Sequence, residues 1–161
     1  MMNKIKGYKA YNNMNDRFNN SYEIGKEYYI EGPIKFKERG FHFCKNLEDV
    51  FRYYNGFDEN TVICEVEGFG EIDTYNDEYY GYYDMYASSN IKIIKVLSRE
   101  EIIDIIINRN IDSIKRFISG FKLTKEEELI ILNKFREEII EKYIDYYQKN
   151  DEKAFTKKRS W

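Results

Sequence analysis

The chain contains one histidine, His42, and two cysteines, Cys44 and Cys64, so these side chains are the first candidates for chemistry. A zinc site takes about four ligands from Cys, His or carboxylate, and neither the number nor the spacing of these residues matches a common pattern. His42 and Cys44 are two positions apart, which puts both on one strand face and makes a cysteine–histidine pair geometrically feasible. We favour structural packing, and we predict no metal, no catalytic constellation and two reduced thiols.

The segments that must position these residues alternate apolar and polar side chains up to residue 97. Strands are predicted over 4–11, 22–32 (two short strands interrupted at Gly25), 40–44, 61–72 and 88–97. A short helix is predicted over 46–54, with Asn46 as its N-cap. The alternation places Phe41 and Phe43 opposite His42 and Cys44. If the strands over 40–44 and 61–67 pair, the two cysteines are expected to be neighbours.

The period of the apolar pattern changes after residue 97. Ser98 with Glu101, and Thr124 with Glu127, form two capping-box patterns that open helices, the second running to about Gln148. That helix carries an apolar stripe consisting of Leu132, Phe135, Ile139, Tyr143 and Tyr146. We therefore predict an α+β domain over 1–97 with a small, mainly antiparallel sheet and one short helix. A helical segment follows over 98–150, and 151–161 is expected to be a frayed tail.

The composition of the chain limits the kinds of partner that it is expected to bind. The net charge of −3 argues against direct binding of nucleic acid by the whole surface. No apolar run approaches the ~20 residues of a membrane span, and the N-terminus has no apolar core of a signal peptide. These features predict a cytoplasmic protein that does not enter a membrane.

Five blocks of sequence resemble a domain of uncharacterised function that is widespread in phage and prophage proteins. They are "IKGYKAYN", "YEIGKEYYIEG", "ERGFHFCKNLEDVFRYY", "CEVEGFGEI" and "SSNIKIIKVLS", in that order over residues 4–97. The resemblance rests on the order of these five blocks, which include a "GFHFC" signature. It implies an origin in a mobile element but no activity, and the helices after residue 98 lie outside it.

A looser likeness is to ADP-ribosyltransferases, and it implies NAD as the cofactor. Such an enzyme needs an aromatic ring against nicotinamide and a carboxylate that stabilises an oxocarbenium ion. Tyr8 and either Glu65 or Glu67 are the corresponding residues. The chain departs from the family's pattern because it lacks the starting His or Arg and has His42 where the family prefers Tyr.

The segment 71–89 is distinctive because it has five acidic residues, six tyrosines and no basic residue. It is expected either to cover a sheet edge as a solvated hairpin or to bind a host protein with a basic surface. The expected partner-binding residues are Asp73, Tyr75, Asp77, Glu78, Tyr79, Tyr80, Tyr82, Tyr83, Asp84 and Tyr86.

The leading hypothesis is therefore a phage- or prophage-derived cytosolic binding protein. It would act by occupying a host macromolecule, such as a defence or nucleic-acid enzyme, and would need no cofactor. The alternatives are an ADP-ribosyltransferase-like enzyme that uses NAD, and a structural or accessory module that self-associates through its helices.

Overall fold

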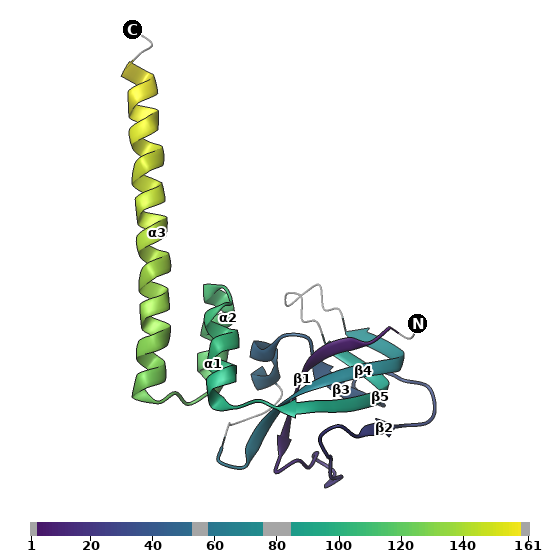
Figure 1. The fold of residues 1–161 in the computed structure, drawn as a ribbon. Helices are drawn as coiled ribbons and strands as arrows, with labels where there is room; N and C mark the ends of the chain where they lie inside the picture. Colours follow the sequence, from purple (N-terminus) through teal and green to yellow (C-terminus); the bar gives the residue numbers. More distant parts are fainter. Residues whose placement is uncertain (1–2, 53–57, 76–84, 159–161) are drawn as a thin grey trace. The chain divides into compact units, whose positions relative to one another are not determined.

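The computed structural model describes residues 3–52, 58–75 and 85–158, and it divides the chain into two compact units, Met1–Lys122 and Leu123–Trp161. The first unit contains an antiparallel sheet, a short 3-10 helix and two α-helices, and the second unit contains one long helix (Figure 1). The predicted α+β class, with a mainly antiparallel sheet followed by helices, is confirmed.

The sheet of the first unit closes on itself. Its strands are β1 (Ile5–Asn12), β2 (Glu27–Tyr29), β3 (Phe41–Cys44), β4 (Thr61–Tyr75) and β5 (Met85–Val96), and all their pairings are antiparallel. β3 pairs with β1, β1 with β4, β4 with β5, and β5 with β3. This circuit makes a small barrel. β2 pairs with the same edge of β5 as β3 does.

The strand boundaries differ from the predicted ones in two places. Only 27–29 of the predicted strands over 22–32 form a ladder, because the Tyr22 amide donates to the Met14 carbonyl within the preceding loop and Gly25 turns the chain with φ of 81°. β4 and β5 are longer than expected at the ends that face each other, since residues 72–75 of β4 pair with 85–88 of β5.

The barrel interior is apolar. Its buried side chains come from four strands and the loop after β1, and they are Tyr11, Tyr22, Phe43, Cys64, Val66, Ile91 and Ile93. The Phe43 ring lies over two glycines: a Cβ on Gly68 would come within 2.2 Å of this ring, and one on Gly7 within 2.6 Å. β3 and β4 are not neighbours, so Phe43 reaches Gly68 across the interior. The predicted separation of Phe41 and Phe43 from His42 and Cys44 is confirmed.

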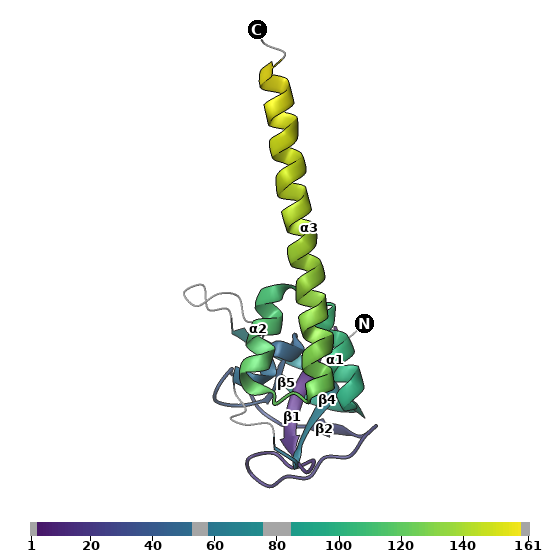
Figure 2. The same ribbon diagram turned by 90° about the vertical axis from the view of Figure 1, so that its left-hand side faces the viewer.

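The outer face of the barrel is covered by η1 (Leu47–Arg52), a 3-10 helix, and by α1 (Arg99–Ile107) and α2 (Ile111–Gly120). α1 and α2 lie side by side, and η1 lies between them and the strands (Figures 1 and 2). The predicted helix over 46–54 is thus a shorter 3-10 helix, and 53–54 lie outside the described residues. The Asn46 side chain donates to Asp49 Oδ2 at 3.3 Å, and the Asp49 amide donates to the Asn46 backbone carbonyl at 3.3 Å.

The capping boxes predicted at the starts of two helices are confirmed. At α1, the Ser98 hydroxyl accepts from the Glu101 amide and the Glu101 carboxylate accepts from the Ser98 amide. At α3 (Lys125–Lys158), Thr124 and Glu127 make the same reciprocal bonds. α3 extends ten residues beyond the expected end at Gln148. None of the helices in the described part of the chain is long and apolar enough to cross a membrane.

We predict that Gly68→Ala lowers the free energy of unfolding by about 2 kcal/mol or more, because the new methyl group overlaps the packed Phe43 ring. Urea denaturation measures the change. Gly25→Ala is the control, since its Cβ meets nothing within 4 Å and its cost of about 1 kcal/mol comes from the positive φ alone. Phe43→Leu should partly rescue Gly68→Ala, and strictly additive effects would contradict this packing.

Candidate functional site

The His42 side chain is held by contacts within the fold. Its Nε2 accepts a hydrogen bond from the Lys37 backbone amide at 2.9 Å, and its ring meets Phe36 edge-on at a centroid distance of 5.2 Å. Burial, with the nearby Lys9 charge, lowers the pKa of His42 below its ordinary value. An imidazole whose Nε2 is an acceptor is neutral and has no lone pair left for a metal or a proton transfer there.

The two cysteines lie on opposite faces of the sheet. β1 separates β3 from β4, and adjacent residues of β1 pair with the two thiol positions: Tyr8 with Cys44, and Lys9 with Cys64. β3 and β4 therefore do not pair, so the condition for the two cysteines to be neighbours is not met. Cys64 Sγ lies 3.7 Å from Met14 Sδ, and burial raises the pKa of this thiol to about 12. Within the described residues, no group of three or more His, Cys, Asp or Glu side chains has the arrangement of a metal site.

Lys9 is a lysine on the interior side of the barrel, because directly paired residues share a face and its partner is Cys64. Its Nζ donates to the His42 carbonyl at 2.6 Å and lies 5.5 Å from the Tyr11 ring centroid. Burial of the ammonium group lowers the pKa of Lys9 to about 8, although Cys44 and Asp16 partly oppose this shift. Sequence reasoning had left Lys9 without a role.

The structure brings together two of the three residues expected in an ADP-ribosyltransferase-like site. Tyr8 and Glu65 are directly paired across β1 and β4, and burial followed by the Glu65 charge raises the pKa of Tyr8. Each glutamate is also part of a row of opposite charges across the strands. Glu65 pairs with Lys95 on β5, and Glu67 lies between Lys6 and Lys92. Such rows stabilise the outer face of a sheet.

The segment 71–89 consists largely of the paired ends of β4 and β5. Asp73 Oδ2 accepts from the Phe36 amide at 2.7 Å, and Tyr86 stacks on Phe43 at a centroid distance of 5.5 Å, so both have partners within the fold. The Tyr75 backbone pairs with Met85. The remaining expected partner-binding residues lie outside the described residues: Asp77, Glu78, Tyr79, Tyr80, Tyr82, Tyr83 and Asp84.

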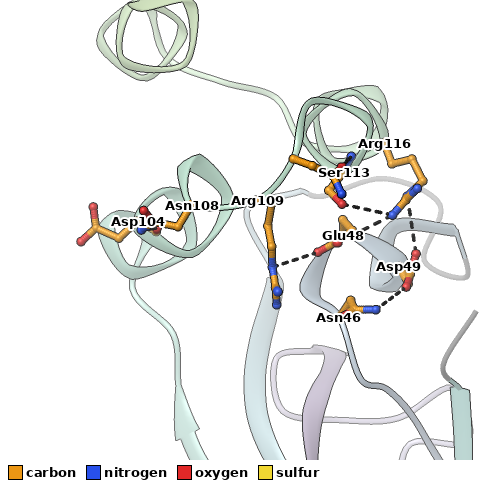
Figure 3. Close-up of polar contacts among 9 residues, drawn as sticks. Asn46, Glu48, Asp49, Asp104, Asn108, Arg109, Ser113 and Arg116 are labelled. Atoms are coloured by element: carbon orange, nitrogen blue, oxygen red, sulfur yellow. Dashed lines mark hydrogen bonds and ion pairs between the residues drawn. The ribbon is translucent and has the colours of Figure 1, made fainter. Parts of the chain in front are cut away.

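A cluster of four charged side chains joins η1 to the α-helical pair (Figure 3). Glu48 and Asp49 on η1 are 3% and 1% exposed, and Arg109 and Arg116 face them from the loop before α2 and from α2 itself. Arg116 Nη2 lies 3.7 Å from Glu48 Oε1, and its Nε lies 3.7 Å from Asp49 Oδ1. Arg109 Nε lies 3.8 Å from Glu48 Oε2. Sequence reasoning missed this cluster because its paired acids and bases are 61 to 68 positions apart.

This cluster is built to hold elements together. Two carboxylates face two guanidinium groups, so the formal charges balance, although the Arg109 Nε–Glu48 Oε2 and Arg116 Nε–Asp49 Oδ1 contacts are ion pairs without a hydrogen bond. Arginine does not give up its proton in proteins, so neither base can act in proton transfer. Arg116 Nη2 is also fixed by the Ser113 hydroxyl at 3.2 Å, and Asp49 by Asn46. The arrangement therefore acts as a clamp between η1 and α2.

A separate open pocket of about 500 Å³ lies beside α1. Its lining residues are Asp58, Glu59, Thr61, Arg99 and Lys122. Arg99 already donates to the Lys122 carbonyl at 2.5 Å and lies 4.5 Å from the Phe121 ring centroid. The Thr61 hydroxyl donates to Asp58 at 2.9 Å, and this bond is the main cause of the lowered pKa of Asp58. Arg99, Thr61 and Asp58 in this pocket thus bond to other groups of the fold.

Fold and site together define a small α+β protein whose closed antiparallel sheet is braced by a buried ionic clamp. The chain belongs to the family described as "Domain of unknown function (DUF7666)", whose model matches residues 5–105. The match extends past residue 97 and so includes most of α1, which the expected resemblance had left out. No curated protein and no solved structure matches the chain.

We predict that Arg116→Ala lowers the free energy of unfolding by about 3 kcal/mol, because it leaves the buried carboxylates of Glu48 and Asp49 with too little compensating charge. Chemical denaturation at neutral pH measures the loss. The control is Lys115→Ala on the same helix, whose side chain is 64% exposed and pairs only with exposed Asp112, so its change should stay within about 0.5 kcal/mol. Equal effects of the two variants would show that the clamp contributes nothing.

We also predict that Lys9 makes stability rise with pH. The folded chain loses the Lys9 proton near pH 8, whereas the unfolded chain keeps it up to its ordinary pKa of 10.5. Unfolding then takes up a proton in this window, so the free energy of unfolding increases between pH 8 and 10.5. Above its ordinary pKa, the Cys64 thiol makes the free energy of unfolding fall with pH. The quantity to measure is therefore the difference in free energy of unfolding between wild type and Lys9→Met. A difference that is constant from pH 7 to 10 would exclude this titration.

Proposed function

We propose that the protein is a binding protein that docks on a basic surface of another macromolecule through the end of the β4–β5 hairpin. The observation that carries this proposal is the pairing of Tyr75 with Met85, the last pair of the long β4–β5 ladder. Tyr75 and Met85, which precede and follow the connection 76–84, therefore lie side by side at the end of the ladder. Binding segments are commonly presented in this way, on a loop held by a scaffold.

The chemistry of the connection supports a basic partner. Residues 76–84 contain three acids, four tyrosines and no basic residue. Tyrosine provides contact area and a hydroxyl at little entropic cost, and carboxylates accelerate encounter with a positive surface. Because Asp73 and Tyr86 already have partners in the fold, the proposed surface narrows to Tyr75, Asp77, Glu78, Tyr79, Tyr80, Tyr82, Tyr83 and Asp84.

The proposal includes the setting expected from the sequence. The protein would derive from a phage or prophage, act in the host cytoplasm, and occupy a host protein such as a defence or nucleic-acid enzyme. The net charge of −3 supports a protein partner with a positive surface, and it does not favour direct contact with nucleic acid. No cofactor takes part.

An NAD-dependent enzyme is the second candidate, and the direct pairing of Tyr8 with Glu65 is the observation that favours it. An oxocarbenium ion would need the Glu65 carboxylate, whose cross-strand neighbour is Lys95. This candidate predicts that Glu65→Gln abolishes hydrolysis of NAD while leaving partner binding intact. The binding proposal predicts no NAD hydrolysis by the wild type.

We predict that reversing the three acids of the connection, with Asp77→Lys, Glu78→Lys and Asp84→Lys, weakens binding to a captured partner about tenfold or more. The loss should come from slower association, and binding of the wild type should weaken as salt rises. Capture from host lysate identifies the partner, and surface plasmon resonance at low and high salt then measures the rates. The melting temperature should change little.

The matched control reverses three exposed acids elsewhere in the first unit: Glu23, Glu38 and Asp112, with side chains 71%, 63% and 77% exposed. It changes the net charge equally, so it separates local docking from a general charge effect. Equal binding by the two triple variants would overturn the proposed surface.

A further inference from the structure

The open pocket beside α1 has two walls of opposite charge. Arg99 and Lys122 form the basic wall, and they lie together because Arg99 Nη2 donates to the Lys122 carbonyl at 2.5 Å. Asp58 and Glu59 form the acidic wall and are adjacent in sequence. All four residues belong to the first unit. The volume of about 500 Å³ is that of a site for a small molecule.

The two walls do not neutralise each other. Among the described residues, no ion pair joins an acid of one wall to a base of the other, so their charged groups stay more than 4.0 Å apart. In the same parts of the chain, the Glu59 carboxylate and the Lys122 ammonium group make no ion pair or hydrogen bond, and both residues are exposed. An acid and a base that line one cavity without meeting suit a ligand that carries both signs of charge.

One residue of each wall is held in place by the fold. The Thr61 hydroxyl donates to Asp58 Oδ1 at 2.9 Å, and Thr61 itself is buried. The Arg99 guanidinium lies 4.5 Å from the centroid of the Phe121 ring, which is also buried. Charged groups that are already fixed reduce the ordering cost of binding. Each wall thus combines one positioned charge with one charge that has no partner.

We propose that this pocket binds a small zwitterion of the amino-acid type, either a free α-amino acid or a short peptide. The ligand's carboxylate lies against the basic wall and pairs with Lys122. Its ammonium group lies against the acidic wall and pairs with Glu59. A ligand with a single charge leaves one wall uncompensated, and a simple anion meets the repulsion of the two acids as well as the attraction of the two bases.

The test is an NMR titration of the isotope-labelled full chain with two sets of probes, the free L-amino acids and glycyl dipeptides, which differ in the separation of their charges. At least one probe should shift the amide signals of the lining residues in a saturable way. Lys122→Gln and Glu59→Gln should each weaken its binding about tenfold or more, because each removes one charged partner. Both side chains are exposed, so the melting temperature should stay unchanged.

The matched controls are Lys115→Gln and Glu38→Gln. They remove the same charges from side chains that are 64% and 63% exposed and that lie outside the pocket lining, so they should bind the probe as the wild type does. Derivatives of the probe assign the walls. The N-acetylated probe has no ammonium group, so Glu59→Gln should not weaken its binding further. The amidated probe has no carboxylate, so Lys122→Gln should not weaken its binding further.

Three results would each overturn the proposal. They are a panel in which no probe shifts the signals of the pocket, a Lys122→Gln or Glu59→Gln variant that binds as tightly as the wild type, and a derivative with one charge that binds as tightly as the zwitterion. None of these measurements involves the connection 76–84, so a failure here is separate from a failure of the proposed function.

Discussion

The packing of one aromatic ring against two glycines sets the dimensions of the first unit. Phe43 crosses the barrel interior from β3 and lies against Gly7 on β1 and Gly68 on β4, where any larger residue would overlap the ring or, at Gly7, the Cys44 carbonyl. A sheet of this size can close only if opposite walls approach closely, and glycine permits that approach. The remaining interior side chains, including Tyr11 and Val66, then fill the space on either side of the ring.

Closure of the barrel explains why the outer face needs an ionic clamp. With the interior filled by its own side chains, η1 must pack on the outside, where Cys44, Val50 and Met85 form a separate small cluster. η1 is a short 3-10 helix with little intrinsic stability. Arg109 and Arg116 hold it through its two buried acids, and Phe51 adds an edge-on contact with Phe117 at 5.3 Å. The helical pair α1–α2 is thus tied to the sheet through η1.

The parts of this structure that could be predicted from sequence are those specified by local signals. Alternation identified the strands that contain Phe43 and Cys64, and reciprocal Ser98–Glu101 and Thr124–Glu127 patterns identified two helix starts, because the interacting residues are three positions apart. Closure of the sheet, the insertion of β1 between the two cysteines and the clamp depend on contacts between distant residues, such as Glu48 with Arg116. For the same reason, the hydrogen bond that the Asp73 carboxylate accepts from the Phe36 amide, 37 positions away, could not be predicted.

The filled barrel also bears on where function resides. In the described part of the first unit, His42 and Lys9 have polar atoms bound to backbone groups, Glu67 is in an ion pair with Lys4 at 3.3 Å, and Glu65 lies opposite Lys95 in the strand register. These side chains, which were candidates for chemistry, therefore help to stabilise the sheet. By composition, the connection 76–84 carries three acids, four tyrosines and no basic residue. Six leucine and isoleucine side chains of α3 are between 46% and 60% exposed. Under the binding function proposed above, the connection would supply the charge and the aromatic contact area.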